Sequence, residues 1–115
     1  MTTLADQKCI PCQGGIPPMT REKAEEYLAR TPGWSVDDEG IRISRHFTFR
    51  NFKQALAFVN AVGDAAETEG HHPDMTLGWG YVTVVLFTHK IKGLHENDFI
   101  MAAKANALYD QTDKS

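Results

Sequence analysis

The sequence predicts an α+β fold: a four-stranded antiparallel sheet with three helices on one face, in the order α-β-β-α-β-β-α. Three observations support this prediction. Residues 41–49 alternate between apolar and polar side chains, as in a half-buried strand. Residues 52–69 repeat apolar side chains at helical spacing. Two extended segments within residues 74–88 flank Gly78-Trp79-Gly80, which indicates a hairpin.

The first half of the chain contains one predicted helix and two predicted strands. Thr20 is a good N-cap for a helix from Arg21 to about Arg30, which Thr31-Pro32-Gly33 ends. A short strand over residues 34–36 and an acidic turn lead to the alternating strand. The expected core face of that strand is Ile41, Ile43, Phe47 and Phe49.

The second half begins with a long predicted helix. Asn51 and Gln54 resemble a capping box at the start of a helix from Phe52 to about Glu69, and Gly70 ends it. A last helix is expected from about Glu96 to Tyr109. The predicted apolar stripe of the long helix is Phe52, Leu56, Val59, Val62 and Ala66.

The second hairpin strand, residues 81–88, is apolar on both faces. Val82, Val84 and Leu86 would face the helices, which leaves Val85 and Phe87 on the uncovered face. Because exposed apolar patches usually mark interfaces, this face predicts contact between subunits.

The 115 residues are predicted to form a flexible N-terminal arm over residues 1–18 and a single domain over residues 19–115. The arm contains Gly14-Gly15 and Pro17-Pro18 and lacks periodicity. Cys9 and Cys12 are interpreted as reduced thiols in this arm, or as half of a metal site completed by other ligands.

Charge and hydropathy exclude several classes of function. A net charge of −3 gives no electrostatic footprint for nucleic acid. No apolar run approaches the ~20 residues that span a bilayer, and the first residues lack the features of a secretory signal. We therefore expect a cytoplasmic protein that binds neither nucleic acid nor a membrane.

Three histidines can be brought together by the hairpin. If the hairpin is centred on Gly80, His71 faces His89, and His72 is one step away. Imidazoles give and take protons near neutrality, so the cluster suits removal of water across a carbon–nitrogen unit. A three-histidine zinc site and ordinary loop histidines are the alternatives. Asp98 either orients an imidazole or is a first-turn acid favoured by the helix dipole.

The residues just described belong to a larger pattern. It comprises Glu69-Gly70-His71-His72-Pro73-Asp74, Trp79, Thr88-His89, Gly93-Leu94 and Asn97-Asp98-Phe99, with Phe49, Phe52, Ala55 and Phe58 entering the long helix. This pattern resembles the pterin-4a-carbinolamine dehydratase family, in its bacterial form, over about residues 17–109. One departure is His95, where relatives often have a serine or threonine that caps the last helix, which puts the stability of that helix start in doubt.

The resemblance implies dehydration of 4a-hydroxytetrahydropterin, the 4a-carbinolamine, to quinonoid dihydropterin, without a metal or cofactor. This step recycles the pterin of aromatic amino-acid hydroxylases, typically phenylalanine hydroxylase. His71 and His72 would share acid/base work at the 4a-hydroxyl and N5, while His89 would bind the pterin or serve the other stereoisomer. The resemblance also implies a homodimer or homotetramer. Asp98 would support the histidines, and the expected substrate contacts are Pro73, Asp74, Trp79 and Thr88.

A non-enzymatic function is the alternative. Some relatives of the family act as binding partners, stabilising a transcription factor's dimer or influencing a hydroxylase's expression. The intact histidines favour catalysis here.

Overall fold

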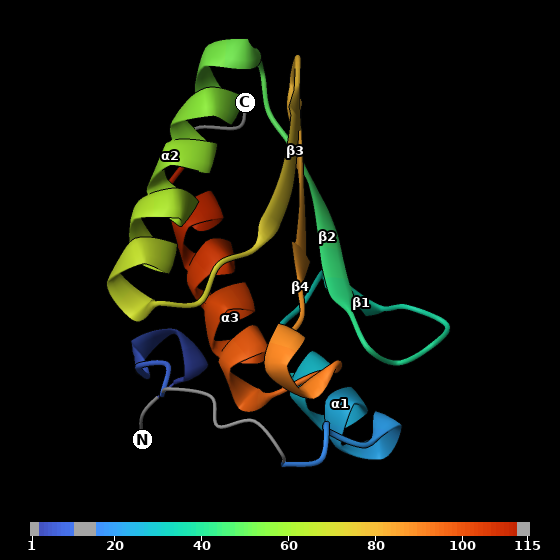
Figure 1. Cartoon of the computed structure of the whole chain (residues 1–115). Helices are drawn as coiled ribbons and strands as arrows, with labels where there is room; N and C mark the ends of the chain where they lie inside the picture. Colours follow the sequence, from blue (N-terminus) through green and yellow to red (C-terminus); the bar gives the residue numbers. More distant parts are fainter. Residues whose placement is uncertain (1–2, 11–15, 113–115) are drawn as a thin grey trace.

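One antiparallel sheet forms one layer of the computed structural model, which describes residues 3–10 and 16–112 (Figure 1). Its strands follow the spatial order β1-β2-β4-β3, so β4, the second strand of the predicted hairpin, is a central strand and β3 is an edge strand. The four strands are β1 (Ser35–Val36), β2 (Ile43–Thr48), β3 (Asp74–Gly78) and β4 (Tyr81–Leu86).

The helices are α1 (Arg21–Leu28), α2 (Phe52–Glu69) and α3 (Glu96–Asp110), with short 3₁₀ turns η1 (Leu4–Asp6) and η2 (His89–Ile91). In Figure 1, α2 and α3 lie side by side against one face of the sheet. At the start of α3, the ring of Phe99 stacks on Tyr27 of α1 with 5.1 Å between centroids. The predicted α+β class and element order are confirmed. None of the helices in the described part of the chain is long and apolar enough to cross a membrane.

The helix ends follow from local chemistry. The Thr20 hydroxyl accepts the Lys23 N–H at 3.2 Å, and the Asn51 carbonyl oxygen accepts the Gln54 N–H at 2.9 Å. Gly70 ends α2 in the left-handed region at φ 68°, which glycine adopts at little steric cost. The three predicted terminal signals are confirmed.

The doubt about the start of α3 was wrong. His95 caps this helix: its Nδ1 accepts the Asn97 N–H at 3.0 Å, while its own N–H donates to Asp98 Oδ2 at 2.9 Å. An imidazole nitrogen therefore supplies the acceptor that a serine or threonine hydroxyl would supply.

We expect His95→Ala to lower the free energy of unfolding by about 1 kcal/mol, because the Asn97 N–H loses its acceptor. His95→Ser restores a capping oxygen and should recover most of that loss. Urea unfolding of the three proteins checks this. Equal losses in both variants would contradict a capping role for the side chain.

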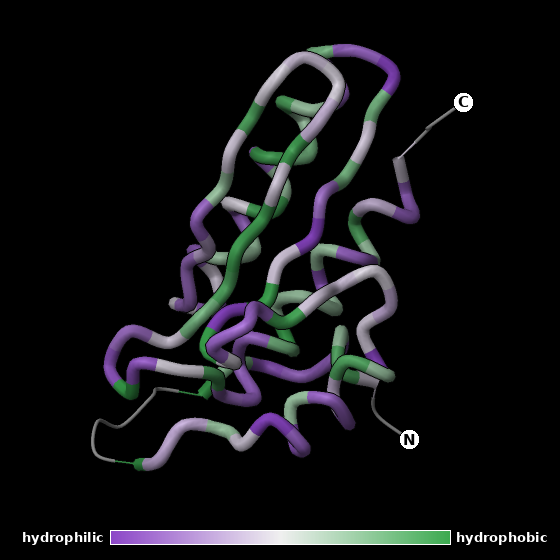
Figure 2. The backbone as a smooth tube through the Cα atoms, turned by 90° about the vertical axis from the view of Figure 1, so that its right-hand side faces the viewer, coloured by the Kyte–Doolittle hydropathy of each residue, from purple (hydrophilic) through white to green (hydrophobic). Residues whose placement is uncertain are grey.

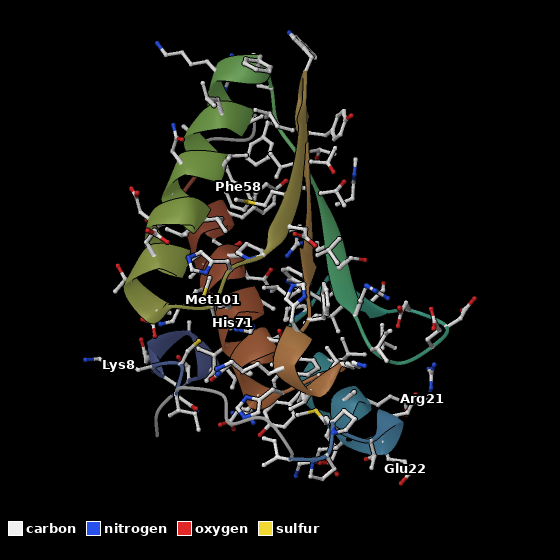
Figure 3. The ribbon with its side chains drawn as sticks, viewed as in Figure 1. Lys8, Arg21, Glu22, Phe58, His71 and Met101 are labelled. Carbon is white, nitrogen blue, oxygen red and sulfur yellow. The ribbon has the colours of Figure 1, made fainter. Side chains whose placement is uncertain are left out.

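The core lies between the sheet and the two long helices. Phe58 of α2, which is labelled in Figure 3, packs on Phe47 of β2 and on Phe49 just after that strand, with ring centroids 4.7 and 5.1 Å apart. The predicted stripe of α2 was partly wrong, because Phe52 and Leu56 are 44% and 40% exposed. The bulky side chain of Phe58 fills the space beside β2. The buried face of α2 is therefore the row of residues at helical spacing that contains Phe58, and not the row that contains Phe52 and Leu56. The buried row is Ala55, Phe58, Val62 and Ala66.

The hairpin register differs from the prediction by one residue. Gly78 pairs with Tyr81 and Asp74 with Val85, so only Trp79 and Gly80 form the turn. If this register is continued past the open end of the β3–β4 hairpin, His71 does not lie opposite His89. β4 ends at Leu86, and the chain turns into η2 at His89.

β4 is a largely hydrophobic run along the chain (Figure 2). Val82, Val84 and Leu86 are buried beneath the helices, whereas Val85 and Phe87 are partly exposed. Contact between subunits through that second face stays a prediction.

Residues 3–10, hereafter the N-terminal strap, lie against the domain, and the division into an arm over residues 1–18 and a domain over residues 19–115 stays a prediction. Leu4 is buried in the core, and Lys104 Nζ of α3 donates to the Ala5 carbonyl at 2.7 Å. Sequence alone missed this because the strap contacts residues almost a hundred positions away. Cys12, the other cysteine of the predicted arm, lies outside the described residues.

Candidate active site

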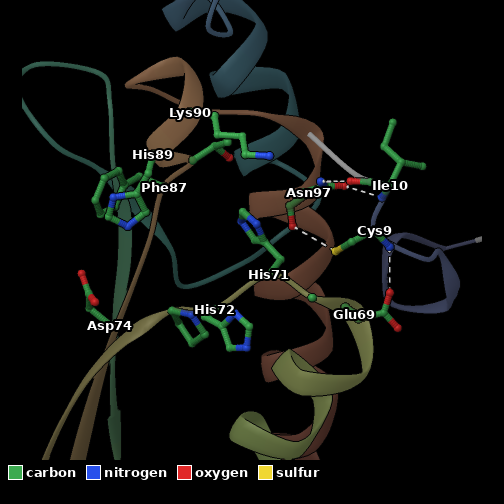
Figure 4. A pocket seen from close by; sticks show the side chains of 13 residues that line it. Cys9, Ile10, Glu69, His71, His72, Asp74, Phe87, His89, Lys90 and Asn97 are labelled. Carbon is green, nitrogen blue, oxygen red and sulfur yellow. Dashed lines mark hydrogen bonds between the residues drawn. The ribbon is translucent and has the colours of Figure 1, made fainter. Parts of the chain in front are cut away.

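A pocket of about 560 Å³ opens where the carboxyl end of α2 and the amino end of α3 meet the open end of the β3–β4 hairpin (Figure 4). It brings together six of the residues singled out from the sequence. They are His71, His72, Pro73, Asp74, Thr88 and His89.

His71 is anchored to Asp98 at this site. Its Nε2 lies 2.6 Å from Asp98 Oδ1, and the two side chains are 12% and 0% exposed. The other carboxylate oxygen accepts the Thr88 hydroxyl and the His95 N–H, each at 2.9 Å. Because a carboxylate only accepts hydrogen bonds, Nε2 of His71 carries the proton, and Nδ1 of the neutral ring keeps its lone pair.

Local structure explains why these two residues meet. Gly70 reverses the chain after α2, so that His71 starts the extended segment leading into β3. Asp98 is the third residue of α3 and belongs to its capping box. One oxygen of Asp98 therefore accepts a hydrogen bond at the helix cap, while the other lies against the imidazole of His71.

His72 points to a different partner. Its Nε2 is hydrogen-bonded to Glu67 of α2, and both side chains are largely exposed. His72 lines the pocket next to His71 (Figure 4). Screening by solvent makes such an exposed pair worth little for stability.

His89 reaches the pocket from η2. Its ring contacts Phe87, with 4.1 Å between centroids, and Figure 4 shows both on one side of His71. Aromatic rings in tilted contact present an apolar surface to a planar ligand. Three imidazoles from two chain segments, residues 71–72 and η2, thus line one pocket, although the hairpin register differs from the prediction.

Trp79 stands apart from the other predicted contacts. It occupies the hairpin turn, is 71% exposed and does not line this pocket. The pocket also contains residues outside the predicted set of catalytic and substrate-binding residues. Four are used below: Cys9, Ile10, Glu69 and Asn97.

Cys9 is a pocket residue with an unusual thiol. Burial, reinforced by the carboxylate of Glu69, raises its pKa from 9.0 to about 12. Its Sγ donates to the Asn97 carbonyl at 3.7 Å. The thiol is therefore neutral across the range in which enzymes are assayed.

We expect Cys9 to resist alkylation, because only the thiolate attacks iodoacetamide. In a Cys12→Ser background at pH 8, the folded protein should react at least about a hundredfold more slowly than the urea-unfolded protein. The rate should keep rising above pH 9 until the protein unfolds. Mass spectrometry of timed samples checks this, and equal rates in both states would contradict the raised pKa.

Within residues 3–10 and 16–112, no group of three or more histidine, cysteine, aspartate or glutamate side chains is arranged to hold a metal ion.

Comparisons with known proteins identify the family of this chain. The family model described as Pterin 4 alpha carbinolamine dehydratase matches residues 17–108. A relative from Azoarcus sp. (strain BH72), named as a candidate pterin-4-alpha-carbinolamine dehydratase, is 55% identical over 94% of this chain and 92% of its own. One from Halorhodospira halophila (strain DSM 244 / SL1), with the same name, is 57% identical over 92% and 97%.

Solved structures show the same fold. The transcriptional coactivator/pterin dehydratase from Brucella melitensis has a TM-score of 0.77 and 34% identity, covering 80% of this chain and 98% of that one. A pterin dehydratase-like protein, identified as a RuBisCO assembly factor in the alpha-carboxysome, has a TM-score of 0.59 and 25% identity, covering 68% and 94%. On this evidence, the chain belongs to the pterin-4a-carbinolamine dehydratase family, a family of hydro-lyases.

Proposed function

We propose that this protein removes water from 4a-hydroxytetrahydropterin by histidine acid/base catalysis, giving quinonoid dihydropterin. The observation that carries the proposal is the buried Asp98–His71 pair, which opens into a pocket lined by two further imidazoles. Membership in the dehydratase family supplies the substrate class.

The reaction needs one proton added and one removed. The C4a–O bond breaks as the hydroxyl leaves as water, and N5 loses its proton as the double bond to C4a forms. His71 suits the removal from N5, because Asp98 fixes its tautomer and stabilises the imidazolium that results. His72 then suits the protonation of the hydroxyl, with the Glu67 carboxylate beside its charged form.

His89 is assigned a different task. With Phe87 it forms one wall of the pocket, where it binds the pterin or protonates the hydroxyl of the other 4a stereoisomer. Because C4a is tetrahedral, the hydroxyls of the two stereoisomers leave from opposite faces of the ring. One acid cannot reach both faces equally, so a second acid on another wall would explain the third histidine.

The product returns to the tetrahydro form by reduction, so this step belongs to recycling of the pterin used by an aromatic amino-acid hydroxylase such as phenylalanine hydroxylase. A homodimer or homotetramer assembled through the exposed face of β4 is part of the same proposal. Size-exclusion chromatography with light scattering tests the assembly.

The direct test is the rate of quinonoid dihydropterin formation from enzymatically generated 4a-hydroxytetrahydropterin. We expect acceleration over buffer that survives prior treatment with a chelator and collapses in His72→Ala. No acceleration by wild-type protein would overturn the proposal. Activity lost on chelation and restored by zinc would replace it with a metal-dependent mechanism.

A second candidate function is a non-catalytic role as a binding or regulatory partner. The observation that favours it is the similar fold of the pterin dehydratase-like protein identified as a RuBisCO assembly factor. A partner role would leave binding intact after all three histidines are replaced, whereas dehydration would not survive that change.

A further inference from the structure

The N-terminal strap lies outside residues 17–108, the part of the chain that the family model matches, yet it reaches the pocket. Cys9 and Ile10 form part of the pocket wall next to Asn97 (Figure 4). The proposed chemistry assigns no task to the strap.

The strap is attached through its backbone at two neighbouring points. The Ile10 N–H donates to Asn97 Oδ1 at 3.0 Å, and Asn97 Nδ2 donates back to the Ile10 carbonyl at 2.6 Å. The Cys9 N–H donates to Glu69 Oε1 at 2.7 Å. These bonds span 87 and 60 residues of sequence, so they join segments that no local structure connects.

Both attachment points are next to the catalytic pair. Asn97, which is buried, directly precedes Asp98, and Glu69 precedes His71 by two residues. The strap therefore bridges the end of α2, which leads to the imidazole, and the start of α3, which carries the carboxylate.

A third contact fixes the strap from the other side. Lys104 Nζ donates to the Ala5 carbonyl at 2.7 Å and lies 3.9 Å from Glu69 Oε2. Lys104 does not line the pocket. It ties α3, the strap and the end of α2 together from outside the site.

We infer that the strap is a positioning element of the active site: by clamping Glu69 to Asn97, it holds His71 in register with Asp98. The expected change in kcat rests on the proposed function, whereas the expected effect on the contact between His71 and Asp98 does not. Asn97 and Glu69 act through the His71–Asp98 pair and are positioning residues. A displacement of about 1 Å at a catalytic group can cost a hundredfold in rate, so a loosened clamp should lower kcat more than it raises KM.

The first test removes one backbone donor. Ile10→Pro deletes the N–H that Asn97 Oδ1 accepts. We expect kcat to fall at least about tenfold, with KM changed less than about threefold. In ¹⁵N-labelled protein, the Nε2–H signal of His71 should broaden or disappear.

The matched control is a proline elsewhere in the strap. Lys8→Pro removes an N–H for which no acceptor is described, and Gln7 before it already has the extended conformation (φ −79°, ψ 155°) that a following proline favours. This variant should keep the wild-type kcat and the His71 signal.

Lys104→Met is a second variant that loosens the strap, and it keeps the test possible if the Ile10→Pro protein fails to fold. It releases the Ala5 carbonyl without touching the pocket, and we expect kcat to fall several-fold at a temperature where circular dichroism shows the variant folded. If folded Ile10→Pro or Lys104→Met keeps both the wild-type kcat and the His71 signal, the clamp is refuted. If wild-type protein has no dehydratase activity, the proposed function fails, while the His71 signal still decides the clamp.

Discussion

Replacing His71 with alanine should lower kcat/KM for the dehydration by about 10³-fold, the largest loss expected from any single histidine of this pocket. His71 is the histidine whose ring is held by a buried carboxylate, and general acid–base catalysis contributes about 10²–10⁴-fold. The measurement is the appearance of quinonoid dihydropterin under steady-state conditions, with the uncatalysed rate subtracted.

His46 provides the matched control. It is an exposed histidine of β2, its Nδ1 lies 2.9 Å from the Thr83 hydroxyl, and it does not line the pocket. His46→Ala should leave both kcat and KM unchanged. A comparable loss in this variant would show that the assay reports a general effect on the fold.

The remaining two histidines separate the proposed roles. With both 4a stereoisomers as substrates, His72→Ala should slow one isomer more than the other, and His89→Ala should show the reverse preference or a raised KM. Equal small losses of rate for every variant and both isomers would contradict these separate roles for the histidines.

Much of the fold was predictable because its signals are local. Caps at Thr20 and Asn51, the stop at Gly70 and the alternation along β2 each depend on a few adjacent residues. His95 shows the limit of such rules, since it caps α3 although imidazole is not a preferred cap. The hairpin register was missed because a two-residue and a three-residue turn fit the same glycines.

The candidate site was predictable in its residue types and only partly in its contacts. Histidines and an acid at the ends of predicted elements pointed to the pocket, and His71, His89 and Asp98 all reach the same region. The partners of the strap were not predictable. The bonds between Ile10 and Asn97 join residues 87 positions apart, and on the strap they use only the backbone of Ile10, which carries no side-chain signal in the sequence.

Asp98→Asn should lower kcat by about 10²-fold or more while the protein stays folded. The carboxylate accepts three hydrogen bonds, from His71, Thr88 and His95. An amide in its place has one accepting oxygen, and the Thr88 hydroxyl and the His95 N–H both require it. The amide nitrogen then faces His71.

That arrangement reverses the tautomer of the imidazole. A donor at the position of Asp98 Oδ1 requires a lone pair on His71 Nε2, which moves the ring proton to Nδ1. The nitrogen that faces the substrate then carries a proton when the ring is neutral and cannot act as the base. In the serine proteases, the corresponding change costs about 10⁴-fold in kcat, which makes 10²-fold a modest expectation here.

Thr88→Val is the comparison that separates this electrostatic effect from loss of packing. It removes one hydrogen bond to Asp98 Oδ2 but leaves the carboxylate and its bond to His71 in place. We expect it to lower the free energy of unfolding by about 1 kcal/mol and kcat less than tenfold. If Thr88→Val and Asp98→Asn lose activity equally, the carboxylate acts only as part of the capping box. A much larger loss in Asp98→Asn, at similar thermal stability, would mean that the charge and geometry facing His71 drive the reaction.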